Sequence, residues 1–135
     1  MSAYLIDTHV FVWLQTDRTR LSATTVDALA DPANDVRLSI AGVLELFDKY
    51  AKRGGTGLDH VLAHGAKALA ADIDEAGVEL LPVTIEHAAA MRGLPLHHRD
   101  PFDRVLIAQA VVDGMTLVSA DRAFDRYVEL SLLRP

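Results

Sequence analysis

Two short apolar runs of this chain each lead into a single aspartate. Residues 3–6 (Ala-Tyr-Leu-Ile) precede Asp7, and residues 115–120 (Met-Thr-Leu-Val-Ser-Ala) precede Asp121. Runs of this length and composition are typical of buried strands. Because ligands bind outside the carboxyl ends of the strands in an open parallel sheet, we expect both aspartates at one functional edge.

The rest of the pattern alternates helices with strands. Further strands are expected at 36–38 and 79–83. Helices are expected at 8–15, 22–30, 39–53, 58–76, 84–92 and 101–112. Glycines, prolines and capping serines mark most of their boundaries. Such alternation favours an α/β fold with a mostly parallel central sheet, right-handed crossovers and helices on both faces.

Two of the expected helices carry pronounced apolar stripes. The stripe of helix 39–53, from which Glu45 is excluded, consists of Ile40, Val43, Leu44, Phe47 and Tyr50. The stripe of helix 58–76 consists of Leu58, Val61, Leu62, Leu69 and Ile73. Apolar residues at this spacing predict the faces that turn toward the core.

Length and composition fit one globular domain that covers residues 1–135. Half of the 135 residues are hydrophobic, which argues against disorder. The absence of cysteine excludes disulfides, thiolate catalysis and Cys-ligated zinc. No secretory signal is apparent, and no apolar run reaches the roughly 18–20 residues that span a bilayer. We therefore expect a soluble cytoplasmic protein with no membrane partner.

The formal net charge of −6 is unusual for a protein that binds nucleic acid. If four of the 19 acidic residues held metal, 15 would remain against 13 basic residues, and the imbalance would be small. Basic residues also follow or flank the candidate acids; they are Lys49, Lys52, Arg53, Arg99, Arg104, Arg122 and Arg126. Taken singly, each of these cations is also explained as a solvated helix side chain or a member of an i,i+4 ion pair.

The segment from Asp100 to Asp103 has the pattern of a helix start. Asp100 suits the N-cap, Pro101 suits the first helical position, and Asp103 falls at the third, where the helix dipole favours a carboxylate. Capping alone can explain both acids. Asp103 can also project toward the strand edge that carries Asp7 and Asp121.

Two other patterns receive structural interpretations. His60 and His64 have an i,i+4 spacing but lack the intervening glutamate of zinc proteases, so a solvated helix surface is expected. Residues 54–57 (Gly-Gly-Thr-Gly) lack a following Gly-Lys-Ser/Thr and are expected to form a mobile turn. His9 adjoins Asp7, and we expect it to have a structural or phosphate-contacting role.

Four segments together resemble the PIN-domain ribonucleases and, within them, the VapC-type toxins of toxin–antitoxin pairs. They are residues 7–14 (Asp-Thr-His-Val-Phe-Val-Trp-Leu), 38–46 (Leu-Ser-Ile-Ala-Gly-Val-Leu-Glu-Leu), 98–110 (His-Arg-Asp-Pro-Phe-Asp-Arg-Val-Leu-Ile-Ala-Gln-Ala) and 117–124 (Leu-Val-Ser-Ala-Asp-Arg-Ala-Phe). The third segment is the most specific, and the resemblance covers nearly the whole chain. It implies a three-layer α/β/α PIN-like domain with endoribonuclease activity.

The resemblance also implies roles for individual residues. The catalytic acids that would hold Mg²⁺ or Mn²⁺ are Asp7, Glu45, Asp103 and Asp121. Candidates for an outer shell around them are Thr8, Asp100 and Ser119. Candidates for RNA contact are Lys49, Lys52, Arg53, Arg99, Arg104 and Arg122. Oxygen ligands suit Mg²⁺, which would assist hydrolysis that leaves a 5′-phosphate and a 3′-hydroxyl.

The partners implied by the resemblance are an RNA substrate, a second copy of the chain and a cognate antitoxin. The antitoxin's C-terminal arm would lie in the active-site groove and place a basic side chain among the acids.

Two other function classes fit the residues alone. A phosphoacceptor signalling domain also pairs strand-end acids with magnesium, although it normally has adjacent acids after its first strand. A binding module without catalysis would use the acids as caps and ion pairs. Convergence of the four acids on one cavity would favour the nuclease.

Overall fold

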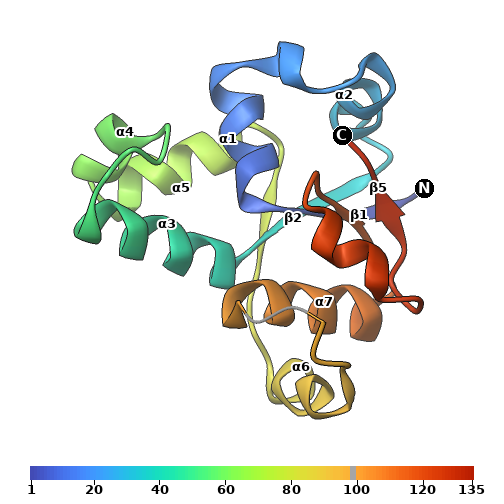
Figure 1. Ribbon diagram of the computed structural model, residues 1–135. Coiled ribbons are helices and arrows are strands. Elements are labelled where there is room, and N and C mark those ends of the chain that lie inside the picture. The colour runs from blue at the N-terminus through green and yellow to red at the C-terminus, as the bar shows by residue number, and fades with distance from the viewer. Residues whose placement is uncertain (98–99) are drawn as a thin grey trace.

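Five short strands form one parallel sheet in the computed structural model, which describes residues 1–97 and 100–135 (Figure 1). The strands are β1 (Ala3–Ile6), β2 (Asp35–Ser39), β3 (Glu79–Leu81), β4 (Thr116–Val118) and β5 (Leu132–Leu133). Their spatial order is β3-β2-β1-β4-β5, and every neighbouring pair is parallel. The chain therefore winds from β1 to β2 and β3, then crosses to β4 on the other side of β1. The expected parallel sheet is confirmed.

The helices connect these strands and are short. They are α1 (Thr8–Thr16), α2 (Ala23–Ala30), α3 (Ile40–Lys52), α4 (Asp59–Ala63), α5 (Ala66–Glu75), α6 (Ile85–Ala90) and α7 (Pro101–Asp113), with 3-10 turns η1 (Arg18–Arg20), η2 (Met91–Gly93) and η3 (Arg122–Arg126). Ser22, Ser39 and Thr84 cap α2, α3 and α6 by accepting backbone N–H hydrogen bonds. None of the helices in the described residues combines the length and the apolar surface that a bilayer crossing requires.

Each face of the sheet is covered by its own hydrophobic core. Because side chains alternate along a strand, Ile6 and Val118 face one core and Leu5 and Leu117 face the other. The first core is completed by buried residues of α1 to α5, including Phe11, Leu46, Leu62, Leu69 and Ile73. The second is completed by residues of α7 and η3, including Leu106, Ile107 and Phe124. The three-layer α/β/α arrangement is thereby confirmed.

The single helix expected at 58–76 is wrong, because the chain forms two helices there. α4 ends at Ala63 and α5 begins at Ala66, with Gly65 between them at φ 90° and ψ −166°. Only glycine adopts this backbone region readily, and Gly65 therefore interrupts the helix. The spacing of the apolar residues continues across the interruption. Both sides of the break still bury the predicted residues, with Leu62 at 3% and Leu69 at 2% exposure.

Strand lengths also differ from the expectation. β3 ends at Leu81 because Pro82 has no N–H to donate to a ladder. β4 ends at Val118, so residues 119–121 form a loop beyond the sheet. The two-residue strand β5 was not predicted, since a run of that length has no detectable period.

The buried face of α3 is rotated relative to the predicted stripe. Ala41, Gly42 and Leu46 are its buried residues, whereas Leu44 is 57% exposed. The expectation that Leu44 belongs to the core-facing side is therefore wrong. The rotation brings Glu45 to a half-buried position at the edge of the core.

The backbone at Gly65 generates a test with a matched control. A Cβ added at Gly65 or at Gly93 would meet no atom within 4 Å, but only Gly65 has a positive φ. We expect Gly65→Ala to lower the free energy of unfolding by about 1–3 kcal/mol through backbone strain, and Gly93→Ala to change it by about 0.5 kcal/mol or less. Urea denaturation of both variants measures the difference, and equal stabilities would contradict the assignment.

Candidate active site

A cavity of about 390 Å³ opens at the carboxyl ends of the central strands. Strand β1 has β2 on one side and β4 on the other, so the connections that leave these strands diverge here. Such a switch point leaves a crevice between the diverging connections. All four predicted acids line the cavity: Asp7, Glu45, Asp103 and Asp121. Residues more than 100 positions apart in the chain thus meet in one place.

Asp7 is fixed at the end of β1 by hydrogen bonds to both carboxylate oxygens. Its Oδ1 accepts from the Thr8 backbone N–H at 2.7 Å, which caps α1. Its Oδ2 accepts from the Ser119 hydroxyl at 2.7 Å. The residue is only 5% exposed, so these donors compensate for the loss of water around its charge.

Asp121 is held by the loop that follows β4. The Asp121 N–H donates to the Ser119 hydroxyl oxygen at 3.1 Å, and the Asp121 Oδ1 accepts from the Ala123 N–H at 2.9 Å. The Ser119 hydroxyl therefore connects Asp7 to the backbone of Asp121. This is the orienting position predicted for Ser119.

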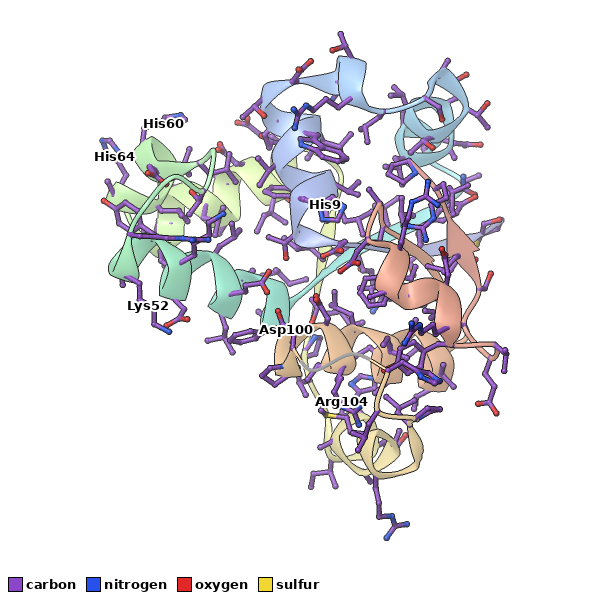
Figure 2. The ribbon with its side chains drawn as sticks, in the orientation of Figure 1. His9, Lys52, His60, His64, Asp100 and Arg104 are labelled. Carbon is purple, nitrogen blue, oxygen red and sulfur yellow. The ribbon has the colours of Figure 1, made fainter. Side chains whose placement is uncertain are left out.

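His9 has a positioning role, in line with the structural role that was one of the two expected for it. Its Nε2 accepts from the Ala120 backbone N–H at 3.1 Å, and its Nδ1 lies 3.3 Å from Asp7 Oδ2. With Nε2 acting as acceptor, the ring proton is on Nδ1 and faces the carboxylate. The ring thus connects α1 to the loop of Asp121 from inside the cavity, and Figure 2 shows it between these elements.

Glu45 lines the cavity from α3, together with Asp7 and Thr8 at the start of α1. At this point α1 and α3 approach closely. A Cβ at Gly42 would lie only 2.7 Å from the Thr8 hydroxyl oxygen, closer than such atoms pack. Gly42 therefore makes room for the Thr8 hydroxyl beside the cavity, which explains the absence of a side chain at this position.

The start of α7 contributes two acids rather than one. Asp100 caps the helix by accepting from the Phe102 N–H at 2.9 Å, and Asp103 lies in the first turn, as predicted. Carboxylate oxygens of Glu45, Asp100 and Asp103 all lie within 4.8 Å of one another. Asp100, predicted as an outer-shell residue, therefore belongs to the most tightly grouped acids in the described part of the chain.

Crowding of these carboxylates makes their ionisation costly. Burial, followed by the charges of Asp7 and Asp100, raises the pKa of Asp103 to about 8, and the charges of Glu45 and Asp121 act in the same direction. Burial and the charges of Asp100 and Asp7 also raise the pKa of Glu45, although Lys49 and the Thr8 hydroxyl oppose this. The site as folded is therefore short of positive charge.

Three of the basic residues predicted to contact RNA lie together beside the acidic cavity. Lys49, Lys52 and Arg53 line a second groove of about 760 Å³, together with Pro101, Phe102 and the acids Glu45, Asp48 and Asp100. Lys49 and Glu45 line both this groove and the acidic cavity, so the two hollows meet at α3. Lys52 points outward on α3 (Figure 2) and forms the expected pair with Asp48 at 2.9 Å.

Two of the other residues predicted to contact RNA, Arg104 and Arg122, lie outside this groove. The Arg104 guanidinium donates to the carbonyls of Pro95 and Met91 at 3.0 and 3.1 Å, so it fixes the turn before α7. Arg122 is an exposed residue of η3, directly after Asp121. The expectation for Arg99 lies outside the described residues.

A further cation, Arg20, lines the cavity and was not identified from the sequence. Its guanidinium carbon lies 5.3 Å from the centroid of the Trp13 ring, and the His9 ring lies 4.9 Å from the same indole. A cation–π contact of this kind has no fixed sequence spacing, so no pattern could have indicated it. His60 and His64 lie far from this group on the exposed side of α4, as predicted (Figure 2).

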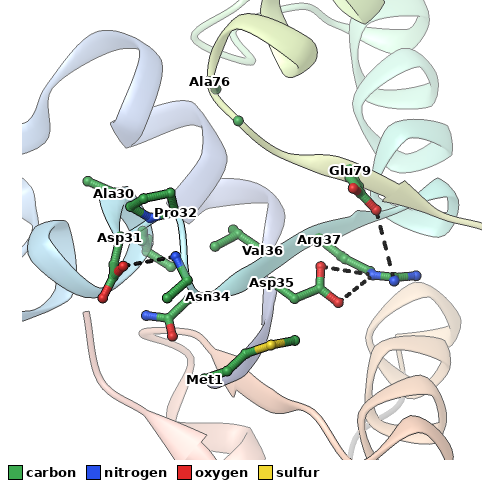
Figure 3. A pocket seen from close by; sticks show the side chains of 13 residues that line it. Met1, Ala30, Asp31, Pro32, Asn34, Asp35, Val36, Arg37, Ala76 and Glu79 are labelled. Carbon is green, nitrogen blue, oxygen red and sulfur yellow. Dashed lines mark hydrogen bonds and ion pairs between the residues drawn. The ribbon is translucent and has the colours of Figure 1, made fainter.

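The opposite edge of the sheet has a hollow of about 560 Å³ without this chemistry (Figure 3). Its cation, Arg37, is paired with Asp35 at 3.1 Å and lies 3.9 Å from Glu79. Hydrogen bonding to Asp35 raises the pKa of Arg37. Arg37 is thus held between two carboxylates, and among the described residues the acids at this edge form no close group like that of Glu45, Asp100 and Asp103.

Comparison with protein families gives one match over most of the chain. The family model described as PIN domain matches residues 4–130. A search of curated proteins finds no match.

Solved structures show the same fold at low sequence identity. VapBC2 from Rickettsia felis, bound to a DNA fragment from its promoter, has a TM-score of 0.68 at 16% identity and covers 97% of both chains. FitAcB from Neisseria gonorrhoeae has a TM-score of 0.67 at 20% identity, covering 98% of this chain and 97% of that one. VapBC-5 from Mycobacterium tuberculosis, a member of the VapBC family of toxin–antitoxin systems, has a TM-score of 0.61 at 20% identity and covers 100% of both.

The contact between Gly42 and Thr8 predicts a non-additive mutational effect. Gly42→Ala should displace the Thr8 side chain and lower the free energy of unfolding by about 1–2 kcal/mol. In a Thr8→Ala background the hydroxyl is gone, so the same substitution should be neutral or stabilising through helix propensity. A double-mutant cycle by chemical denaturation measures this coupling. Additive effects would show that the two positions do not compete for space.

The raised pKa of Asp103 predicts that its carboxylate destabilises the metal-free protein. A carboxyl group whose pKa is raised on folding contributes stability below its unfolded pKa of 3.8, and this is lost as the pH rises through about 8. Asp103→Asn should therefore have a higher free energy of unfolding than the wild-type protein at pH 8.5. The gain over wild type should be smaller at pH 4.5. Solvent screening at this partly exposed side chain limits the gain to about 1–2 kcal/mol.

Denaturation in EDTA at the two pH values provides the measurement. Asp74→Asn, which alters an exposed acid of α5, is the matched control and should show no such gain. A destabilising effect of Asp103→Asn at pH 8.5 would contradict the charge crowding.

Proposed function

The chain belongs to the PIN domain family, and from this premise we propose that it is a metal-dependent endoribonuclease and the toxin of a toxin–antitoxin pair. The observation that carries the proposal is the meeting of Asp7, Glu45, Asp103 and Asp121 at one cavity. Acids that served only as caps or surface ion pairs would not need to converge from four elements of the fold. Here they lie together although burial and the charges of the other acids raise the pKa of Asp103.

The residues present fit a divalent cation. All the donors are carboxylate oxygens, which hard cations such as Mg²⁺ and Mn²⁺ prefer. Oxygens of Glu45, Asp100 and Asp103 lie within 4.8 Å of one another, a spacing that one cation can share. We propose that these three residues hold the cation together with Asp7 and Asp121. A bound cation of this kind would supply Lewis acidity to water and to the scissile phosphate.

The protein side chains then have separate tasks. Asp7 keeps its orientation through Ser119 and Thr8, so its carboxylate is preorganised before any ligand arrives. Asp103 retains a proton near neutral pH in the metal-free protein and would release it when positive charge enters. His9 and Ser119 hold the loop of Asp121 against β1. No histidine is needed as a general base.

The RNA would lie across α3, where the acidic cavity joins the second groove, which holds cations as well as acids. Lys49 lines both hollows, and Lys52, which pairs with Asp48, and Arg53 line the second. Cations in these positions would contact the phosphates on one side of the scissile bond, while Arg20 lines the acidic cavity and Arg122 is an exposed residue directly after Asp121. An unpaired strand suits the site because Asp7 is buried below the cavity rim, beyond the reach of a stiff duplex.

An antitoxin is the protein partner that fits this charge distribution. The structurally similar proteins named above include members of toxin–antitoxin complexes. A basic side chain entering the cavity would neutralise the same acids that a cation does, and it would block substrate access at the same time. We further propose that the enzyme acts in the cytoplasm as a homodimer, as its resemblance to VapC-type toxins implies.

Cleavage of a fluorescent single-stranded RNA tests the proposal. Wild-type protein should cut the RNA in Mg²⁺ or Mn²⁺ and leave 5′-phosphate ends, and cutting should stop in EDTA. Asp7→Asn and Asp103→Asn should each lower the rate by at least about 100-fold, because each removes the charge of a proposed ligand. Asp103→Asn is the cleaner test, since the hydrogen bonds of Asp7 also support the fold.

The variant Asp74→Asn, which alters an exposed acid, should retain wild-type activity. It controls for loss of activity during preparation of the variants. Cleavage that persists in EDTA, or in Asp103→Asn, would reject the metal-dependent mechanism. A comparison of Mg²⁺ with Mn²⁺ at equal concentration establishes which cation supports the faster reaction.

A further inference from the structure

Arg134, which follows β5, reaches back to the loop that carries Asp121. Its Nη1 donates to the carbonyl oxygens of Ser119 and Asp121 at 2.8 and 3.0 Å. Its Nη2 pairs with the carboxylate of Asp125 in η3. The side chain is 40% exposed, so the guanidinium covers the outer side of the loop.

These hydrogen bonds complete the contacts of a loop that has left the sheet. The N–H groups of Ser119, Ala120 and Asp121 donate respectively to the Leu133 carbonyl at 3.2 Å, to His9 Nε2 at 3.1 Å and to the Ser119 hydroxyl at 3.1 Å. The carbonyls on both sides of Ala120 point the other way, to Arg134. His9 therefore holds the loop from inside the cavity, and Arg134 holds it from outside.

The chemistry of arginine matches this position. One guanidinium nitrogen carries two N–H groups and can donate to two carbonyls, while the second nitrogen pairs with a carboxylate in the same plane. An exposed ion pair to Asp125 alone would contribute little, since such pairs are screened by solvent. The two carbonyl contacts are thus the part of the interaction that constrains the direction of the Asp121 backbone.

We propose that Arg134 is a positioning residue that fixes the Asp121 loop and thereby sets the affinity of the site for a divalent cation. The cation-binding part of this inference rests on the proposed function. Arg134 does not line the acidic cavity, so its effect would be transmitted through the backbone of residues 119–121. Losing it would let Asp121 move away from the other acids while the hydrophobic cores stay intact.

The test compares Arg134→Ala with three other variants. Arg134→Lys keeps the charge but not the planar fork, Asp125→Asn removes the ion pair but keeps both carbonyl contacts, and Arg126→Ala removes an exposed arginine of η3 as the charge control. Calorimetric titration with Mn²⁺ measures affinity, and hydrogen exchange of the Ala120 and Asp121 amides in metal-free protein measures loop order. Thermal unfolding reports the overall stability.

Arg134→Ala should weaken Mn²⁺ binding about 10-fold and accelerate exchange of the two loop amides at least about 10-fold. Arg134→Lys should fall between this variant and wild type. Asp125→Asn and Arg126→Ala should stay within about 2-fold of wild type in Mn²⁺ affinity. If Arg134→Ala does not fold, the lysine variant carries the same comparison.

Unchanged amide exchange in Arg134→Ala would overturn the proposal, and so would an equal loss of Mn²⁺ affinity in Arg126→Ala. Absence of Mn²⁺ binding by the wild-type protein would instead reject the metal-dependent function. In that case the amide exchange of the metal-free variants still decides whether Arg134 orders the loop. Failure of the inference and failure of the proposed function are thus distinguished.

Discussion

Asp7 joins three elements that meet only in the folded protein. Its two carboxylate oxygens contact the start of α1 and the loop after β4. Its backbone N–H donates to the carbonyl of Val118 at the end of β4. Hydrogen bonds to a buried charge contribute about 1.5–3 kcal/mol each, so a neutral or smaller residue here would loosen the fold as well as the site. The geometry of the other acids depends on this anchor, because β1 lies at the centre of the sheet.

The structure maintains a balance between local order and charge repulsion. Asp7 and Asp121 are satisfied by hydrogen bonds, whereas Asp103 and Glu45 have raised pKa values because they face other acids at partial burial. The crowded acids at the centre of the site are unfavourable for folding. The hydrogen bonds of Ser119, Thr8 and His9 around them are favourable. Functional sites commonly break the local rules that the rest of a fold obeys.

The sequence predicts those parts of the molecule that depend on local pattern. The runs before Asp7 and Asp121, the caps at Ser22 and Ser39, and the Asp100–Pro101 helix start each contain their own signal, and the structure confirms them. What failed depends on backbone detail, as at Gly65, or on the angle at which α3 meets the core, as at Leu44. The role of His9 depends on a contact between segments far apart in the chain. The roles of Arg20 and Arg134 depend on side-chain directions that a single sequence does not record.

The meeting of the two hollows at Glu45 and Lys49 affects which ligands the surface can select. A short ligand fills only one hollow, whereas a longer chain spans both without a second loss of translational freedom. The second contact then acts at a high effective concentration, so affinity rises steeply with ligand length until both hollows are filled. Discrimination by length would thus arise from the junction of the two hollows at α3, before any individual base is recognised.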